Sequence, residues 1–184
     1  MLDIIKDVIE ELERIKIFDV HKFTKNLVAS SGRRFFIIGN GGSASTASHF
    51  AADLQNLGYD AACLADSPAR VTSLVNDKGW GRVYTEQMAH FVKDDALVVF
   101  TVHGCTGAEE VGPWSQNILE AVQLALKIGG EVFLFSGLSG GYFKDHHLDV
   151  KRLTVKSGDT DVVEGIHLVL THQICSFLKE IDKR

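Results

Sequence analysis

The stretch RFFIIGNGGS, residues 34–43, decides the fold of this 184-residue chain. Its short run of consecutive apolar residues is typical of a strand buried on both faces of a parallel sheet. The glycines permit the positive φ of a tight turn, and a helical pattern over residues 44–57 comes next. Strand, turn and helix in this order predict the opening unit of an α/β domain.

The same alternation of strand and helix runs through the rest of the chain. Apolar runs predict strands at residues 61–64, 96–102 and 131–136, and one final strand or two short ones within 148–155. Helical periodicity is found in residues 44–57, part of 77–91, 118–128 and 162–181. These elements predict a three-layer αβα sandwich with a mostly parallel five-stranded sheet, in which ligands bind at the carboxyl ends of the strands.

Residues 1–30 have a helical pattern, because apolar residues recur at helical spacing between charged ones. The pattern fits one helix, or two helices broken near Phe18-Asp19. Its apolar stripe would pack on the rest of the domain or on a partner subunit. No linker, repeat or low-complexity tract divides the sequence, so we expect one domain over residues 1–184.

Composition argues against several classes of function. The net charge is −5 and the basic residues are scattered, which argues against direct nucleic-acid binding. No apolar run is as long as a membrane span, which needs about 18 residues. The first residues do not have the pattern of a secretory signal. Three scattered cysteines do not make a disulfide framework, so we expect a cytoplasmic protein with reduced thiols.

The loop at residues 39–43 has the features of an anion-binding turn. Its backbone N–H groups can approach an anion closely, and the start of the following helix adds a partial positive charge. Ser43 could cap that helix or donate its hydroxyl to a phosphate; a plain glycine-rich turn is the alternative. The spacing matches neither a Walker loop nor a Rossmann fingerprint, so no nucleotide cofactor is expected.

Two predicted helices carry side chains suited to a metal ion. His49 and Asp53 are four residues apart, and Glu164 and His172 are eight apart, so each pair shares one face of its helix. Asp161 lies one turn before Glu164. Two imidazoles and two carboxylates form a reasonable ligand set for Zn²⁺. For either pair taken alone, a solvated surface pair is the ordinary alternative.

Three stretches of the sequence resemble the phosphoheptose isomerases, a family of the sugar isomerase (SIS) superfamily. The first is the glycine loop with Ala47, His49-Phe50-Ala51 and Asp53-Leu54, the second is residues 71–77 with Tyr84 and Gln87, and the third is Asp161-x-x-Glu164-x-Ile166-His167-x-x-x-x-His172. The resemblance extends from about residue 33 to residue 184, and more loosely over the helical N-terminus.

This resemblance implies a flavodoxin-like SIS domain that forms a homotetramer, with active sites between subunits and with bound Zn²⁺. It implies isomerisation of sedoheptulose 7-phosphate to D-glycero-heptose 7-phosphate. By resemblance the metal ligands are His49, Asp53, Glu164 and His172. By resemblance the substrate-binding residues are Asn40, Gly41, Gly42, Ser43, Asp77, Thr101, His103, Ser115, Asp161 and Glu164.

We assign Asp53 and His172 as the acid–base pair that moves a proton between C1 and C2 through an enediol. The metal ion would polarise the substrate oxygens. A carboxylate that coordinates a metal is a poor base, so the sequence leaves open whether Asp53 is mainly ligand or mainly base.

The sequence departs from the family pattern at several positions. Asp53 stands where the family has Glu, and Glu164 where it has Gln. In the second phosphate loop His103 replaces a serine, and several residues are inserted before Ser115. The phosphate anchors would be Ser43, Thr101, His103, Thr106 and Ser115. Alternatively, the insertion is a tolerated loop and Ser115 only caps the next helix.

Two other functions are compatible with the same fold. One is a SIS tetramer without catalysis that binds the bacterial replication initiator; the presence of His49 and His172 argues against it, because a scaffold has no use for them. The other is a SIS protein that acts on a different sugar phosphate, which the altered loop before Ser115 supports.

Overall fold

Five parallel strands form the sheet, in the order β2-β1-β3-β4-β5. The computed structural model describes residues 3–29, 34–105, 115–138 and 140–181. The strands are β1 (Phe35–Gly39), β2 (Ala61–Cys63), β3 (Ala96–Phe100), β4 (Glu131–Ser136) and β5 (Lys151–Thr154). The chain adds β2 on one side of β1 and β3 on the other. The gap between the ends of β1 and β3 is therefore the topological switch point, where such sheets bind ligands.

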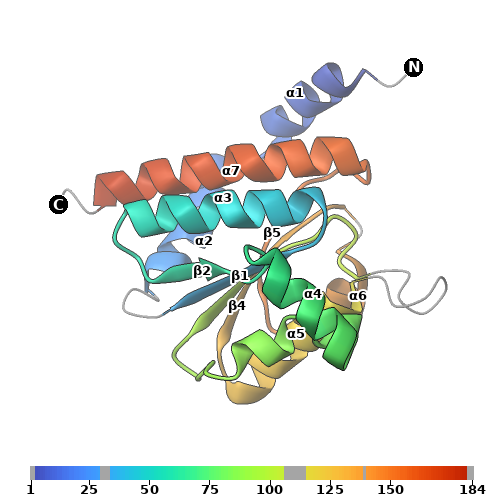
Figure 1. The fold of residues 1–184 in the computed structure, drawn as a ribbon. Coiled ribbons are helices and arrows are strands. Elements are labelled where there is room, and N and C mark those ends of the chain that lie inside the picture. Colours follow the sequence, from blue (N-terminus) through green and yellow to red (C-terminus); the bar gives the residue numbers. More distant parts are fainter. Residues whose placement is uncertain (1–2, 30–33, 106–114, 139, 182–184) are drawn as a thin grey trace.

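Helices cover both faces of the sheet (Figure 1). One layer holds α2 (Ile17–Ala29), α3 (Gly42–Asn56) and α7 (Thr160–Ile181), with α1 (Ile4–Arg14) packed on α7. The other holds α4 (Pro68–Lys78), α5 (Gln116–Ile128), α6 (Gly141–Asp145) and the 3₁₀ helices η1 (Trp80–Arg82) and η2 (Thr85–Met88). The predicted three-layer sandwich is confirmed, and its sheet is entirely parallel. No helix among the described residues is both long and apolar enough to cross a membrane.

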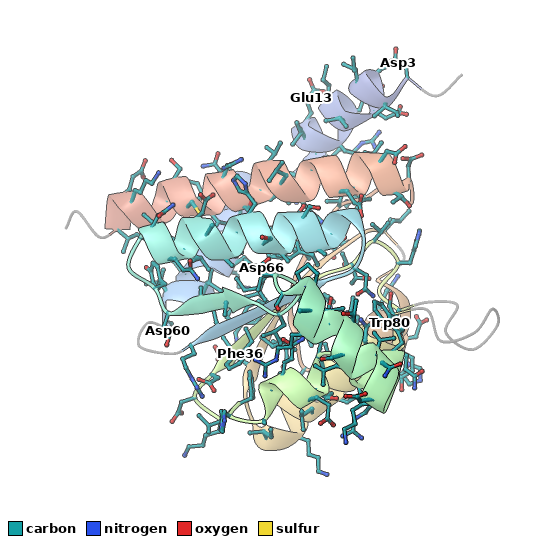
Figure 2. All side chains as sticks on the ribbon, viewed as in Figure 1. Asp3, Glu13, Phe36, Asp60, Asp66 and Trp80 are labelled. Atoms are coloured by element: carbon teal, nitrogen blue, oxygen red, sulfur yellow. The ribbon has the colours of Figure 1, made fainter. Side chains whose placement is uncertain are left out.

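The core consists of two apolar clusters, one on each side of the sheet. Successive side chains of a strand point to opposite faces. Phe35 and Ile37 of β1 therefore pack under α2, α3 and α7, whereas Ile38 packs under α5. Phe36 lies on the α5 side as well (Figure 2). Because both faces are covered, the strands needed nearly continuous apolar runs, which is why the sequence located them well.

The N-terminal segment forms two helices, and the predicted position of the break was wrong. Ile15 adopts an extended conformation (φ −72°, ψ 119°) that ends α1, so the break falls at residues 15–16. Phe18 and Asp19 belong to the first turn of α2, where an acidic residue is favourable. α1 projects beyond the rest of the domain, as the positions of Asp3 and Glu13 show (Figure 2).

The helix expected within residues 77–91 lies earlier, at α4. Ser67 accepts a hydrogen bond from the Arg70 N–H and caps this helix, and Pro68 occupies its first turn. Residues 80–88 form only the short helices η1 and η2. The sequence pattern missed α4 because none of its residues is fully buried, so its apolar periodicity is weak.

Candidate functional site

A pocket of about 180 Å³ lies at the switch point between β1 and β3. Its walls come from the loop after β1, the residues after β3, and the amino ends of α3, α5 and α7. The lining residues are Asn40, Ser43, Phe100, Thr101, Val102, His103, Cys105, Ser115, Ile118, Thr160 and Glu164. The structure thus brings together most of the side chains that the sequence predicted to bind substrate.

A pair of amides holds the glycine loop beside α5. Asn40 and Asn117 exchange two hydrogen bonds of 2.9 Å through their side chains. The hydroxyl of Tyr84 donates to the Asn40 Oδ1 at 3.1 Å and also to the Gly39 carbonyl. Sequence reasoning did not assign a role to Asn117, although an amide on the buried face of α5 is a recognisable signal.

The amino end of α3 holds the carboxylate of Glu164. Gly41 takes the positive φ (58°) that the turn requires and is the N-cap residue of α3. Glu164 accepts hydrogen bonds from the Ser43 N–H at 3.0 Å and from the Ser43 hydroxyl at 3.3 Å. A Cβ on Gly42 would lie 2.1 Å from Glu164 Oε2. At the predicted anion-binding turn, the carboxylate of Glu164 accepts the donors that a phosphate would use, and such a group is favoured at the amino end of a helix.

The opposite wall of the pocket carries Thr101, His103 and Ser115. Ser115 is the N-cap residue of α5, in the left-handed region (φ 54°), but its side chain makes no capping hydrogen bond. Thr101 is buried and His103 is exposed. The predicted anchor Thr106 and the insertion at residues 106–114 lie outside the described residues.

Cys105, in the same wall, is not an activated nucleophile. Burial raises the pKa of its thiol to about 12, so the thiol is protonated at neutral pH. Its Sγ contacts the Ser115 carbonyl at 3.5 Å. The residue therefore contributes packing and a weak hydrogen bond to the pocket wall.

His49, Asp53 and His172 form a cluster further along α3 and α7. Asp53 Oδ2 lies 3.4 Å from His49 Nε2 and 3.6 Å from His172 Nδ1, and the two imidazole rings are nearly perpendicular, with centroids 4.9 Å apart. One ligand atom from each residue lies within 4.8 Å of the others. Two imidazoles and a carboxylate that leave positions open are a donor set of the kind used by catalytic zinc. The chemistry of these residues therefore fits such an ion.

The cluster is open to solvent and is contained in one chain. The side chains of His49, Asp53 and His172 are 49%, 28% and 56% exposed. α3 and α7 pack against each other, so the two predicted helices meet without a second subunit. Three members of the predicted ligand set, His49, Asp53 and His172, therefore lie together, whereas Glu164 does not belong to the cluster.

Three of the predicted site residues lie apart from this cluster. Glu164 is at the α3 amino end, eight residues or about 12 Å along α7 from His172. Asp161 is exposed in the first turn of α7, and Asp77 is exposed near the end of α4, where the Asn76 amide donates to it. Neither Asp161 nor Asp77 lines the pocket.

His167 lies on α7 between Glu164 and His172 and is fully buried against the rings of Phe100 and Phe135. Neither of its ring nitrogens makes a hydrogen bond of normal geometry. Burial lowers the pKa of His167 to about 4, with a weaker opposing effect from the Ser136 backbone. The imidazole is therefore neutral at physiological pH and belongs to the core.

The chain is similar to several known proteins, although no family model matches it. It is 30% identical over 178 residues to a phosphoheptose isomerase from Helicobacter pylori (strain Shi470), covering 93% of this chain and 86% of that protein. It is 36% identical over 148 residues to the lincomycin biosynthesis protein LmbN from Streptomyces lincolnensis, of which the matched region spans 52%. The structure of phosphoheptose isomerase GmhA from Neisseria gonorrhoeae superposes with a TM-score of 0.84 at 25% identity, over 97% of this chain and 94% of that one.

Proposed function

The chain belongs to the phosphoheptose isomerase family, and we propose that it converts sedoheptulose 7-phosphate to D-glycero-heptose 7-phosphate through an enediol. The resemblance predicted from three motifs is confirmed by relatives that match this chain almost from end to end. The chain is accordingly an isomerase of the sugar-phosphate class with the SIS fold. The identity of the sugar and the roles of single residues are our proposal.

The position of Asp53 between two imidazoles is the observation that carries the mechanism. Isomerisation removes a proton from one of the carbons C1 and C2, and returns it to the other, while the two oxygens exchange a proton in the opposite sense. Asp53 and His172 lie 3.6 Å apart and can divide these tasks. Glu164 is less suited to act as a base, because Ser43 already donates two hydrogen bonds to it.

The distance between pocket and cluster supports a long substrate. Ser43 in the pocket precedes His49 by six residues of α3, which is about 9 Å. Glu164 and His172 are about 12 Å apart along α7. A phosphate bound between Thr101 and Ser115 would leave the carbonyl end of an extended sugar near Asp53. The remote phosphate would then orient the reacting carbons.

We assign His49, Asp53 and His172 as ligands of Zn²⁺, with Glu164 as a fourth ligand if its side chain turns away from Ser43. Bound zinc would act as a Lewis acid toward the substrate oxygens. The donor set and the open face of the cluster support this assignment.

We also propose a cytoplasmic homotetramer in which a neighbouring copy covers the cluster. Leu168 and Val169 of α7 are exposed on the helix that carries His172, and Ile5 and Ile9 of α1 are exposed as well. Residues 1–30 would lie at the subunit interface, where such side chains are buried. Light scattering should give four times the 20.2 kDa chain mass, and a monomer would contradict the assembly.

A different sugar phosphate is the second candidate, and Glu164 favours it. Its carboxylate takes both donors of Ser43, which reduces the positive potential available to a phosphate there. A substrate whose hydroxyl groups, instead of its phosphate, approach α3 would suit this arrangement.

The experiment is a comparison of sugar phosphates with the purified chain. Sedoheptulose 7-phosphate, fructose 6-phosphate and ribulose 5-phosphate are each incubated with and without Zn²⁺ and after chelation, and the aldose products are quantified. Preference for the seven-carbon ketose, with loss of turnover after chelation, is expected. Preference for a shorter sugar would establish the second candidate. No turnover of any of them, together with capture of the replication initiator, would support a non-catalytic role.

A further inference from the structure

A second cavity, of about 510 Å³, is lined by residues of α1, α2, α7 and β5 and shares no lining residue with the pocket at the switch point. Its volume is in the range of small-molecule sites. The lining residues that carry the argument come from the end of α1, the residues that join it to α2, α2 itself, and β5 with the residues after it. None of them lines the pocket at the switch point or belongs to the His49 cluster.

The cavity is strongly basic, although the chain as a whole has a net charge of −5. Six basic and two acidic residues line it. They are Arg14, Lys16, Lys22, Lys151, Arg152 and Lys156, with Glu11 and Asp19. Glu11 is paired with Arg14, and Lys151 pairs with Glu131. Among the described residues, Lys16, Lys22 and Lys156 make no ion pair of their own, so positive charge is left for an external anion.

One buried polar atom beside the cavity has no partner. Glu11 is only 4% exposed; its Oε1 is engaged by Arg14, but its Oε2 accepts no hydrogen bond. Arg152 does not add to this need, because its guanidinium donates to the carbonyls of Phe143 and Leu148 on the opposite face of the sheet from Leu153. Leaving such a group unpaired costs about 1–3 kcal/mol, so buried polar atoms are normally satisfied.

The charged groups of the cavity define what a ligand must supply. Lys16, Lys22 and Lys156 can donate to acceptors such as phosphate oxygens, whereas Glu11 Oε2 needs a donor such as a hydroxyl group. Three unpaired lysines around one cavity fit more than one anionic charge. Ile15, Phe23 and Leu153 add apolar surface for a ring.

We propose that this basic cavity binds a small molecule that carries two or more phosphates and free hydroxyl groups, a nucleoside diphosphate being the simplest example. The site does not depend on the isomerase function, because it uses none of the residues assigned to catalysis.

The test is calorimetric titration of the full chain with ADP, inorganic pyrophosphate and adenosine. ADP should bind most tightly, pyrophosphate more weakly, and adenosine least. The double variant Lys22→Gln/Lys156→Gln should weaken ADP binding by about tenfold or more, since each lysine can supply a hydrogen bond to a charged group. The control variant Lys93→Gln/Lys127→Gln, which changes two exposed lysines elsewhere, should leave the affinity unchanged.

Glu11→Gln tests the hydroxyl contact separately. It should reduce the preference for ADP over pyrophosphate without abolishing pyrophosphate binding. Equal affinity of the unmodified chain for ADP and pyrophosphate would overturn the assignment of a hydroxyl-bearing ligand. Absence of binding, or binding that the lysine variant leaves unchanged, would overturn the site itself. A changed oligomeric mass in the lysine variant, with no ligand bound, would instead identify the cavity as a contact between copies of the chain.

Discussion

The two ends of the α3–α7 pair differ in how firmly they hold their polar groups. At the amino ends, Ser43 is 3% exposed and donates two hydrogen bonds to Glu164. Nearly three turns further along α3, Asp53 lies 3.4 and 3.6 Å from two half-exposed imidazoles. These distances are longer than a good hydrogen bond. One pair of helices can therefore hold a carboxylate in place by hydrogen bonds at one end and carry side chains that can rearrange at the other.

The difference also separates the two carboxylates by role. Glu164 has its partners already in the folded chain, whereas Asp53 has neighbours that can rearrange around a substrate or an ion. Acid–base catalysis needs a group that can change its proton and its partners. The four predictions below test this division, from the largest expected effect to the smallest.

Removing the acid–base groups should have the largest effect. Asp53→Asn and His172→Gln should each lower kcat by about 10²–10⁴-fold, the usual contribution of a positioned acid or base. The free energy of unfolding should change little, because both side chains are substantially exposed. Turnover is measured with the preferred sugar phosphate. The controls Asp94→Asn and His90→Gln change exposed residues outside the cluster and should keep full turnover. Unchanged kcat in both cluster variants would show that the cluster of His49, Asp53 and His172 is not catalytic.

His167, between the two ends, should make the stability depend on pH. Its pKa is about 4 in the folded chain against an ordinary value of 6.5, so the unfolded chain binds the extra proton first as the pH falls. The contribution of this residue is complete above pH 6.5 and is lost as the pH falls toward 4. It amounts to about 3 kcal/mol by linkage.

Urea unfolding at pH 7.5 and pH 4.5 measures this dependence, with His167→Leu as the variant that should flatten it. His21→Leu, at an exposed position on α2, is the matched control and should leave the slope unchanged. A steep dependence that survives His167→Leu would place the titrating group elsewhere.

Gly42→Ala should break the hydrogen bonds between Ser43 and Glu164. The new Cβ would lie 2.1 Å from Glu164 Oε2, so the flexible carboxylate must leave Ser43. We expect a loss of about 1 kcal/mol in the free energy of unfolding, the usual value of a lost helix-end hydrogen bond. Gly165→Ala, a helical position on α7 with open space around it, should instead stabilise the protein by about 0.5–1 kcal/mol.

A double-mutant cycle makes the Gly42 prediction specific. In a Glu164→Ala background, Gly42→Ala should become neutral or stabilising, because the collision is gone and alanine favours the helix. If Gly42→Ala lowers the free energy of unfolding equally in both backgrounds, the contact with Glu164 is not the cause of the loss.

Glu164→Gln should have the smallest effect. The amide oxygen can still accept from Ser43, but the charge that complements the α3 amino end is lost, which costs about 0.3–1 kcal/mol of stability. With less negative charge beside the pocket, KM for the phosphorylated substrate should fall a few-fold. A large loss of kcat and of zinc affinity would instead identify Glu164 as a metal ligand in the working enzyme.

Much of this arrangement could be predicted from the sequence, and the failures have physical causes. β1 and β3 were found because strands buried on both faces are nearly all apolar. The spacing of His49 and Asp53 placed them together because a helix repeats every 3.6 residues. The contact of Glu164 with Ser43 could not be predicted, because its direction depends on how α7 crosses the end of α3. The helix α4 was missed because it buries none of its residues fully.

The parallel sheet also governs when a newly made chain can become active. Parallel neighbours cannot be joined by a short hairpin, so every strand pair requires the closure of a long intervening segment. β4 pairs with β5 only after residue 154 has been made, and α7 follows it. Because α7 supplies both Glu164 and His172, the reactive groups meet only after almost all of the described chain has been synthesised. Until then the unpaired apolar strands stay exposed, and such exposed strands are prone to aggregate.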